Sequence, residues 1–502
     1  MSKYILTVDQ STSATKAIIF DNQGRLIYRY NVPHKQYYPK PGWVEHDPEE
    51  IYNNTLIAIK EVIKESGVGL ENIIALSITN QRETALVWDR RTGKPIYNAI
   101  VWQCKRSADI CKKLEEEGLG EFIKGKSGLV LSPYFSASKI KWVLDNVESA
   151  KEKAKRGELL CGTVDSWLVW KLTNGKNHFT DYTNASRTQL LNIKELKWDQ
   201  ELLEIFDIPE SMMPEIKTSD EFYGYLDMGG SSITLPITGI IGDSHAALFG
   251  QTCFEKGMAK ATYGTGSSVM MNVGDSVIIP ASGIVASIGW RLKSGINYVL
   301  EGNINYTGAT IKWLVENLEL ISDPKESGVI ASTVEDTNGV YLVPAFVGLG
   351  APYWDSEARA IITGMSASTK KAHIVRAAEE SIAYQIRDII ELMTRESGIS
   401  LKELRVDGGP TRDDFLMQLQ ADILNVPVVR VKIEELSALG SAFIAGLAVG
   451  LWNNVESLIS LREVDTVFTP KMSQDKRERL YTGWIQAVKR SLNREGNPGY
   501  PL

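Results

Sequence analysis

The sequence predicts an α/β protein built from two halves of similar design. A strand–turn–strand pattern at residues 4–20 recurs at residues 259–272, and each copy opens a half of the chain. Strands alternate with helical stretches in both halves, which is typical of mixed or parallel sheets covered by helices. The 502 residues are 43% hydrophobic and 23% charged, an ordinary composition for a soluble globular protein that excludes a disordered or collagen-like chain.

The elements of the first half follow from local patterns. Residues 4–9 and 15–20 read as two strands joined by a turn of small residues at 10–14. Apolar residues at helical spacing predict a helix over 48–66, with Asp47 as its N-cap before a proline. The apolar run 73–79 has the length of a buried strand, and residues 138–146 have a helical pattern.

The second half shows the same order of a hairpin followed by helices and a further strand. We expect strands at 259–263 and 268–272 around the turn 264–267, and a strand at 404–407. Helical patterns cover 310–318, 371–396 and 414–424. The run 438–452 is too short to cross a bilayer and reads as a buried helix whose small residues permit close packing. We place the domain boundary between domains 1–250 and 251–502. The absence of a low-complexity linker predicts a large interface or a cleft between them.

Charge and cysteine content limit the partners. The net charge is −7 and no basic stripe stands out, which argues against a nucleic-acid partner. Cys104, Cys111, Cys161 and Cys253 form no C-x-x-C pair, so we expect small buried thiols in a reduced, cytoplasmic protein. An N-terminal segment that reaches Asp9 so early is not a signal peptide, and we expect no membrane association.

Two turns could hold phosphate. In the run DQSTSATK at 9–16, small residues and hydroxyls allow an anion to approach the backbone, Lys16 could neutralise charge, and Asp9 could hold a hydrated Mg²⁺. The run GTGS at 264–267 offers similar access, although it is not a Walker A loop. Either turn taken alone could be an ordinary hairpin, and their pairing favours a phosphate site.

Three further runs end predicted strands. Ligands often bind at strand ends in such folds, so DGGP at 407–410 could line a site, or simply turn from strand to helix. Arg82 and Glu83 could bind hydroxyl groups, or form a surface salt bridge. Asp243 could act as general base toward an alcohol, or cap a helix, whereas His245 reads as structural.

Together, longer runs resemble the glycerol kinases of the FGGY carbohydrate-kinase family. The resemblance extends from about residue 3 to about residue 490. It rests on YPKPGWVEHDP at 38–48, TNQRET at 79–84, GKPIYNAIVWQC at 93–104, YFSASKIKW at 134–142, DYTNASR at 181–187 and GLGAPYWD at 348–355.

The resemblance implies two actin-like (ribonuclease H-like) domains with an active-site cleft between them. It implies transfer of the γ-phosphate of ATP to a primary hydroxyl of a polyol, with Mg²⁺ as cofactor. Asp243 matches the catalytic base and Asp9 the Mg²⁺-associated carboxylate. The nucleotide positions are Thr12, Ser13, Ala14, Lys16, Thr265, Gly308, Lys312, Gly409 and Asp413, with Ala14, Lys312 and Asp413 standing where Ser, Gln and Asn are usual. The acceptor positions are Arg82, Glu83, Trp102, Tyr134, Asp243, Ser244 and Ser268.

The acceptor pocket departs most from the family. Ser244 stands where glycerol kinases place Gln, and Ser268 where they place Phe. Two small hydroxyl side chains would leave a wider, more polar pocket. Glycerol is the default acceptor, and a longer polyol, sugar or sugar acid (C4–C6) is the alternative. A non-catalytic binding protein is a third reading, against which Asp9, Asp243 and Thr265 argue because all three are retained. The resemblance also implies a small-molecule partner and a homo-oligomer.

Overall fold

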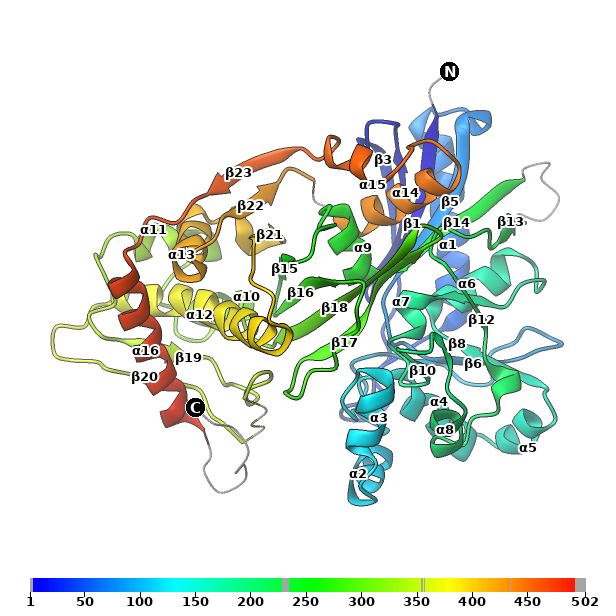
Figure 1. The fold of residues 1–502 in the computed structure, drawn as a ribbon, viewed down its shortest axis with the longest axis horizontal. Helices are drawn as coiled ribbons and strands as arrows, with labels where there is room; N and C mark the ends of the chain where they lie inside the picture. The colour runs from blue at the N-terminus through cyan, green and yellow to red at the C-terminus, as the bar shows by residue number, and fades with distance from the viewer. Residues whose placement is uncertain (1–2, 228–233, 354, 356, 434, 493–502) are drawn as a thin grey trace.

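The computed structural model describes residues 3–227, 234–353, 355, 357–433 and 435–492. The chain forms two large mixed sheets flanked by helices (Figure 1). The first has the strand order β13-β14-β5-β1-β2-β3 and the second β17-β18-β16-β15-β21-β22-β23. The strands of the first sheet are β1 (Tyr4–Gln10), β2 (Ala14–Phe20), β3 (Leu26–Pro33), β5 (Ile73–Asn80), β13 (Gly224–Leu226) and β14 (Leu235–Gly242). Those of the second are β15 (Met258–Tyr263), β16 (Ser267–Gly274), β17 (Val285–Leu292), β18 (Gly295–Ile304), β21 (Glu403–Asp407), β22 (Val428–Val431) and β23 (Val464–Phe468).

The two sheets share one design at their centres. In the first, β1 and β2 form an antiparallel hairpin and β5 runs parallel to β1. In the second, β15 and β16 form the hairpin and β21 runs parallel to β15. The predicted two-domain α/β class, with its duplicated hairpins, is confirmed.

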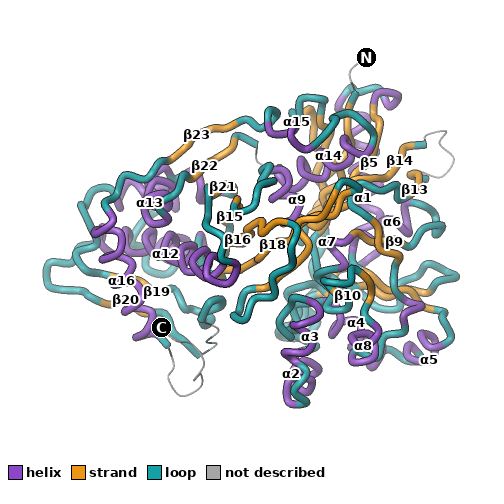
Figure 2. The backbone as a smooth tube through the Cα atoms, in the orientation of Figure 1, coloured by secondary structure: helices purple, strands orange, loops and turns teal. Residues whose placement is uncertain are grey.

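Helices cover both faces of the first sheet. α1 (Pro48–Ser66) and α6 (Val164–Leu172) pack on one face, and α9 (Asp243–Gly250) and α14 (Leu436–Ala448) on the other. α1 has the predicted bounds, and the side chain of Asp47 accepts a hydrogen bond from the backbone N–H of Glu49, as expected of an N-cap. In Figure 2, β16 and β18 of the second sheet extend toward the first sheet, near α9.

α14 ties the C-terminal half to the first sheet. It packs on α9, β14, β1 and β5, and all of its residues from Ala438 to Gly446 are buried. A Cβ on Gly440 would lie 1.9 Å from the carbonyl oxygen of Ala246, so only glycine allows α9 and α14 to cross this closely. The predicted buried helix with close-packing small residues is confirmed, although it spans 436–448 rather than 438–452. Its contacts with α9 include Ala246 and Gly250.

Three helices flank the second sheet near its hairpin. They are α10 (Gly308–Glu316), α12 (Lys371–Ser397) and α13 (Asp414–Leu424), and their apolar residues share one core with β15, β16 and β18. The predicted bounds of α13 are correct. α10 begins two residues earlier than predicted, because the N–H of Gly308 donates to the carbonyl of Gly264 and draws the helix start onto the hairpin.

The remaining elements surround these two units. The helices are α2 (Ala108–Glu116), α3 (Gly120–Ser127), α4 (Ser136–Asn146), α5 (Ala150–Lys155), α7 (Tyr182–Ala185), α8 (Gln200–Ile205), α11 (Ser327–Ala331), α15 (Val455–Ile459) and α16 (Gln474–Ser491). The short strands are β4 (Glu45–His46), β6 (Leu86–Asp89), β7 (Ala99–Ile100), β8 (Leu159–Gly162), β9 (Phe179–Asp181), β10 (Leu191–Asn192), β11 (Lys197–Trp198), β12 (Glu215–Lys217), β19 (Tyr341–Val343) and β20 (Ile361–Thr363).

Three expectations concern the chain as a whole. The four cysteines are buried free thiols, as predicted. Within the described ranges, no helix combines the length and the apolar character that crossing a bilayer requires. In the motif at 348–355, Trp354 lies outside the described residues.

Candidate active site

Arg82 and Asp243 come together where two parallel strands of the first sheet end. Arg82 follows β5, and Asp243 is the first residue of α9 directly after β14. The Nε of Arg82 donates to Oδ1 of Asp243 at 3.1 Å, and the backbone N–H of Ser244 donates to the same oxygen at 2.6 Å. Within the described part of the chain, Oδ2 of Asp243 accepts no hydrogen bond. The side chain of Asp243 is 35% exposed, so Oδ2 is accessible to a ligand.

A buried network of charges holds Arg82 in place. Its two terminal nitrogens donate to Glu301 on β18 at 2.9 and 3.0 Å. Glu301 also pairs with Arg187 at 2.8 Å, and Arg187 donates to Glu83 at 2.6 Å. Burial alone would raise the pKa of Glu301, but the charges of Arg187 and Arg82 outweigh it and lower that pKa well below its ordinary value. The network therefore joins the two sheets through compensated charges.

Ser244 contacts this network directly, and Ser268 is on the strand that pairs with the strand of Glu301. The hydroxyl of Ser244 accepts a hydrogen bond from Nη2 of Arg82 at 3.1 Å. Ser268 is on β16, two positions before Met270, which is opposite Glu301 in the sheet register. The Ser268 hydroxyl is buried and has no hydrogen-bond partner among the described residues. Its hydrogen-bonding capacity is therefore unused by the described residues.

Two aromatic side chains connect the acceptor residues to the first hairpin. The indole N–H of Trp102 donates to the Thr12 hydroxyl at 3.0 Å. The ring of Trp102 meets that of Tyr134 edge to face, with 5.6 Å between centroids. Lys139, fully buried on α4, donates to the carbonyls of Pro133, Tyr134 and Phe135, which fixes the loop that carries Tyr134.

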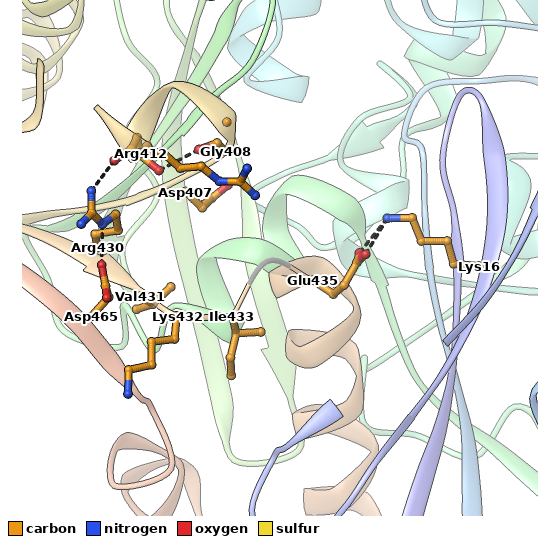
Figure 3. A pocket seen from close by; sticks show the side chains of 12 residues that line it. Lys16, Asp407, Gly408, Arg412, Arg430, Val431, Lys432, Ile433, Glu435 and Asp465 are labelled. Atoms are coloured by element: carbon orange, nitrogen blue, oxygen red, sulfur yellow. Dashed lines mark hydrogen bonds and ion pairs between the residues drawn. The ribbon is translucent and has the colours of Figure 1, made fainter. Parts of the chain in front are cut away.

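The first hairpin brings Asp9 and Lys16 opposite each other. Burial, the largest effect, raises the pKa of Asp9 to about 7, although the charge of Lys16 opposes it. Lys16 itself donates to both carboxylate oxygens of Glu435 at the start of α14, at 2.7 and 2.9 Å (Figure 3). At the tip of the hairpin Ser13 is exposed, and the backbone closes with a hydrogen bond from the N–H of Ser11 to the carbonyl of Ala14.

The second hairpin is closed by the start of α10. The carbonyl of Thr265 accepts hydrogen bonds from the N–H groups of Thr307 and Ala309 at 3.0 and 3.1 Å. A Cβ on Gly266 would lie 2.2 Å from the carbonyl oxygen of Ile304. The glycine at 266 is thus required first by backbone packing inside the protein, which positions the Thr265 turn.

Two cavities meet at Gly409 and Arg412, beyond the second hairpin. One of about 580 Å³ is lined by Lys16, Asp407, Gly408 and Glu435, together with charged residues of β22 and β23 (Figure 3). The other, of about 650 Å³, is lined by Gly308, Gly409, Asp413 and several apolar side chains. Lys312 is not among the residues that line either cavity and pairs instead with Glu316 on the surface of α10, at 3.4 Å.

Some of the alternatives left open by the sequence can now be decided. Arg82 and Glu83 are buried, so the surface salt-bridge reading is wrong. Asp243 is not the N-cap of α9, because Gly242 occupies that position. His245 is fully buried and bonds the Ser287 hydroxyl at 3.0 Å, as a structural histidine would.

Sequence reasoning missed several residues of the site. Arg187 lay inside a recognised motif, but nothing local marked it as a partner of Glu301. The signal for Glu301 was a single acid inside the apolar strand β18. Glu435 gave no signal, because its partner Lys16 is distant in the chain.

At this site the side chain of Asp9 is the buried carboxylate available to a metal ion. Among the residues described, no group of three or more His, Cys, Asp or Glu side chains is placed to hold a metal ion. Asp9 is buried between Lys16 and other carboxylates, and its raised pKa shows that a nearby cation would stabilise its ionised form. The site therefore fits a hydrated divalent cation shared with a ligand.

Comparison with known proteins gives a consistent result. The models of the FGGY family of carbohydrate kinases match at residues 4–250 for its N-terminal domain and 259–449 for its C-terminal domain. The chain is 56% identical to glycerol kinase 1 of Thermotoga maritima, with 97% of this chain and 99% of that one covered. It is 53% identical to the glycerol kinase of Caldanaerobacter subterraneus subsp. tengcongensis, covering 98% and 99%. The crystal structure of Plasmodium falciparum glycerol kinase with ADP superposes with a TM-score of 0.94 at 39% identity, covering 98% and 99%.

Proposed function

The chain belongs to the FGGY family of carbohydrate kinases, and from this premise we propose that it transfers the γ-phosphoryl group of ATP to a primary hydroxyl of glycerol. The observation that carries the proposal is the pairing of Arg82 with Asp243 at 3.1 Å, beside the two hairpins. Similarity to glycerol kinases, one of them crystallised with ADP, supports the choice of substrates.

Asp243 acts as the general base. Its Oδ1 is held by Arg82 and by the backbone of Ser244, which leaves Oδ2 to accept the proton of the attacking hydroxyl. Since Arg82 is fixed in turn by Glu301, the carboxylate keeps its orientation without the substrate. Arg82 and Glu83 bind the hydroxyls, and Trp102 and Tyr134 pack on the carbon chain.

The nucleotide lies across the two cavities. Its phosphates lie between the hairpins, where Thr12, Ser13, Ala14 and Thr265 offer backbone N–H groups and hydroxyls, and its base enters the 650 Å³ cavity past Gly308, Gly409 and Asp413. Asp9 is the residue that would hold a hydrated Mg²⁺, and the bound ion would supply positive charge to the phosphates. Lys16 reaches the phosphates once it leaves Glu435. Lys312 is exposed and pairs with Glu316, so it adds positive charge near the nucleotide and does not contact the base.

A second candidate acceptor is a longer polyol, sugar or sugar acid. The buried, unpartnered hydroxyl of Ser268 favours it, since a ligand with more hydroxyls would supply the missing hydrogen bond. The Ser244 hydroxyl is already engaged by Arg82 and is the lesser part of this argument.

The remaining expectations complete the proposal. We place the domain boundary between residues 250 and 251, at the end of α9, and expect a cytoplasmic homo-oligomer. Size-exclusion chromatography with light scattering tests the oligomer, and a molar mass equal to one chain would contradict it.

The test of function is turnover. Purified protein with Mg²⁺-ATP is offered glycerol and a panel of C4–C6 polyols and sugars, and ADP release and phosphorylated product are both measured. Phosphorylation of glycerol, or of a longer acceptor in its place, supports one of the two candidates. ATP binding with no acceptor phosphorylated would contradict both.

A further inference from the structure

A carboxyl group lies buried in the wall of the 650 Å³ cavity. Glu379, on α12, is 1% exposed and is one of the residues that line this cavity. Its Oε2 is buried without a hydrogen-bond partner among the described residues. A buried polar oxygen left unsatisfied is costly, so this atom is suited to accept a hydrogen bond from a ligand.

Asp413, the N-cap of α13, lines the same cavity. Its side chain accepts hydrogen bonds from the backbone N–H groups of Phe415 and Leu416, at 2.8 and 3.3 Å, where α13 begins. Burial raises the pKa of Asp413, and these backbone N–H groups oppose that rise. Burial, and then the negative charge of Asp413, raise the pKa of Glu379. With its pKa raised to about 8, Glu379 favours the neutral carboxyl at neutral pH.

A neutral carboxyl presents a donor and an acceptor side by side. Its O–H donates and its carbonyl accepts, which matches any flat edge with an N–H donor next to an acceptor atom. Adenine has such an edge in its exocyclic amine and N1, and guanine has one in N1–H and O6. The apolar side chains of Ile311, Val329 and Ile382 in the same cavity suit the faces of a planar base.

We propose that Glu379, backed by Asp413, reads the nucleobase of the phosphoryl donor and accepts both adenine and guanine. The proposal rests on the function proposed above, because that function places a nucleotide in this cavity. It extends it by assigning base recognition to a residue that no sequence motif marked, and by widening the donor to purine nucleotides that carry an N–H edge.

The experiment measures binding rather than turnover. Calorimetric titration of the full-length protein with Mg²⁺ uses ADP, GDP and purine riboside diphosphate, which lacks the exocyclic amine. We expect ADP and GDP to bind within about tenfold of each other, and purine riboside diphosphate to bind at least about tenfold more weakly than ADP. Glu379→Leu should reduce that last difference to less than about threefold, whereas Glu379→Gln, whose amide also offers a donor and an acceptor, should keep it.

Glu380→Gln is the matched control. Glu380 is a buried acid next in the chain, but it pairs with Arg376 and Tyr384 and does not line the cavity. Its substitution should leave the preference among the three diphosphates unchanged. Full discrimination in a folded Glu379→Leu variant, or none in the wild type, would overturn the role of Glu379. Binding of GDP more than about a hundredfold weaker than ADP would overturn the guanine part. Base discrimination without phosphorylation of any polyol would leave this proposal standing and refute the proposed function.

Discussion

The proposed acceptor side and the proposed nucleotide side of the site are held together by different interactions. The acceptor side is a buried network of charges, in which Arg82 and Arg187 form ion pairs with Glu83 and Glu301. The nucleotide side is mostly backbone, since Thr265 and Gly308 are held by main-chain hydrogen bonds around an open cavity. Single side-chain changes should therefore damage the acceptor side severely and the nucleotide side only where a specific atom is read.

The largest effect is expected at Asp243. Asp243→Asn keeps the size of the side chain and can still accept from Arg82, but it cannot take a proton. We expect kcat at saturating ATP and acceptor to fall by about 10²–10⁴-fold. ADP affinity, measured by calorimetry, should stay within about twofold because the nucleotide side is not touched. A kcat within about threefold of the wild type would remove Asp243 from the role of base.

The next effect is on stability. Glu301→Gln leaves the buried Arg82 and Arg187 without their shared counter-charge, and breaking such a pair costs about 3–5 kcal/mol of unfolding free energy. Lys312→Ala on the nucleotide side removes only an exposed pair with Glu316 and should cost less than about 0.5 kcal/mol. Urea unfolding of both variants measures the contrast. Equal losses would show that the two sides do not differ in this way.

Local patterns were enough to predict most of the fold and part of this site. The spacing of apolar residues and the Asp47 cap gave α1, and the repeated hairpins gave the duplication. Asp243 and Arg82 could be found because strand ends are readable from sequence. Glu301 gave only the weak signal of a single acid inside a strand and Glu379 gave none, because each owes its role to partners brought together by tertiary packing. The small Ser268 carried a signal only through resemblance, and its unpartnered hydroxyl is a property of the packed state.

Asp9 interacts with charged groups of both sides, Lys16 and Asp243, and its titration makes the stability of the protein depend on pH. Its ordinary pKa of 3.8 is raised to about 7 by burial, so the folded protein favours the protonated acid. The stability that this provides is complete below about pH 4 and is lost as the pH rises toward about 7, a loss on the order of 4 kcal/mol. Thermal unfolding of the wild type across this range should show the decline, and Asp9→Asn should flatten it. Mg²⁺ should stabilise the wild type more at the upper end, since protons compete with the cation. A pH-independent effect of Mg²⁺ would place the cation elsewhere.

The smallest effect concerns which acceptor is preferred. It tests whether the acceptor side can hold a molecule larger than glycerol beside the buried charge network. The Ser268 hydroxyl is buried and unpartnered, and Ser244 is a short side chain already held by Arg82. A longer acceptor would satisfy Ser268, and glycerol would leave it to water. The second candidate function therefore requires kcat/KM for some C4–C6 acceptor to exceed that for glycerol. The double change Ser244→Gln with Ser268→Phe fills the space and should move the ratio toward glycerol by about tenfold, equivalent to about 1.4 kcal/mol. The change Ser13→Ala, at the exposed tip of the first hairpin on the nucleotide side, is the control and should leave the ratio between acceptors unchanged. If glycerol is preferred to every longer acceptor in the wild type, the longer-acceptor candidate is wrong. Water would then satisfy the Ser268 hydroxyl, and glycerol would be the acceptor that the charge network is built to bind.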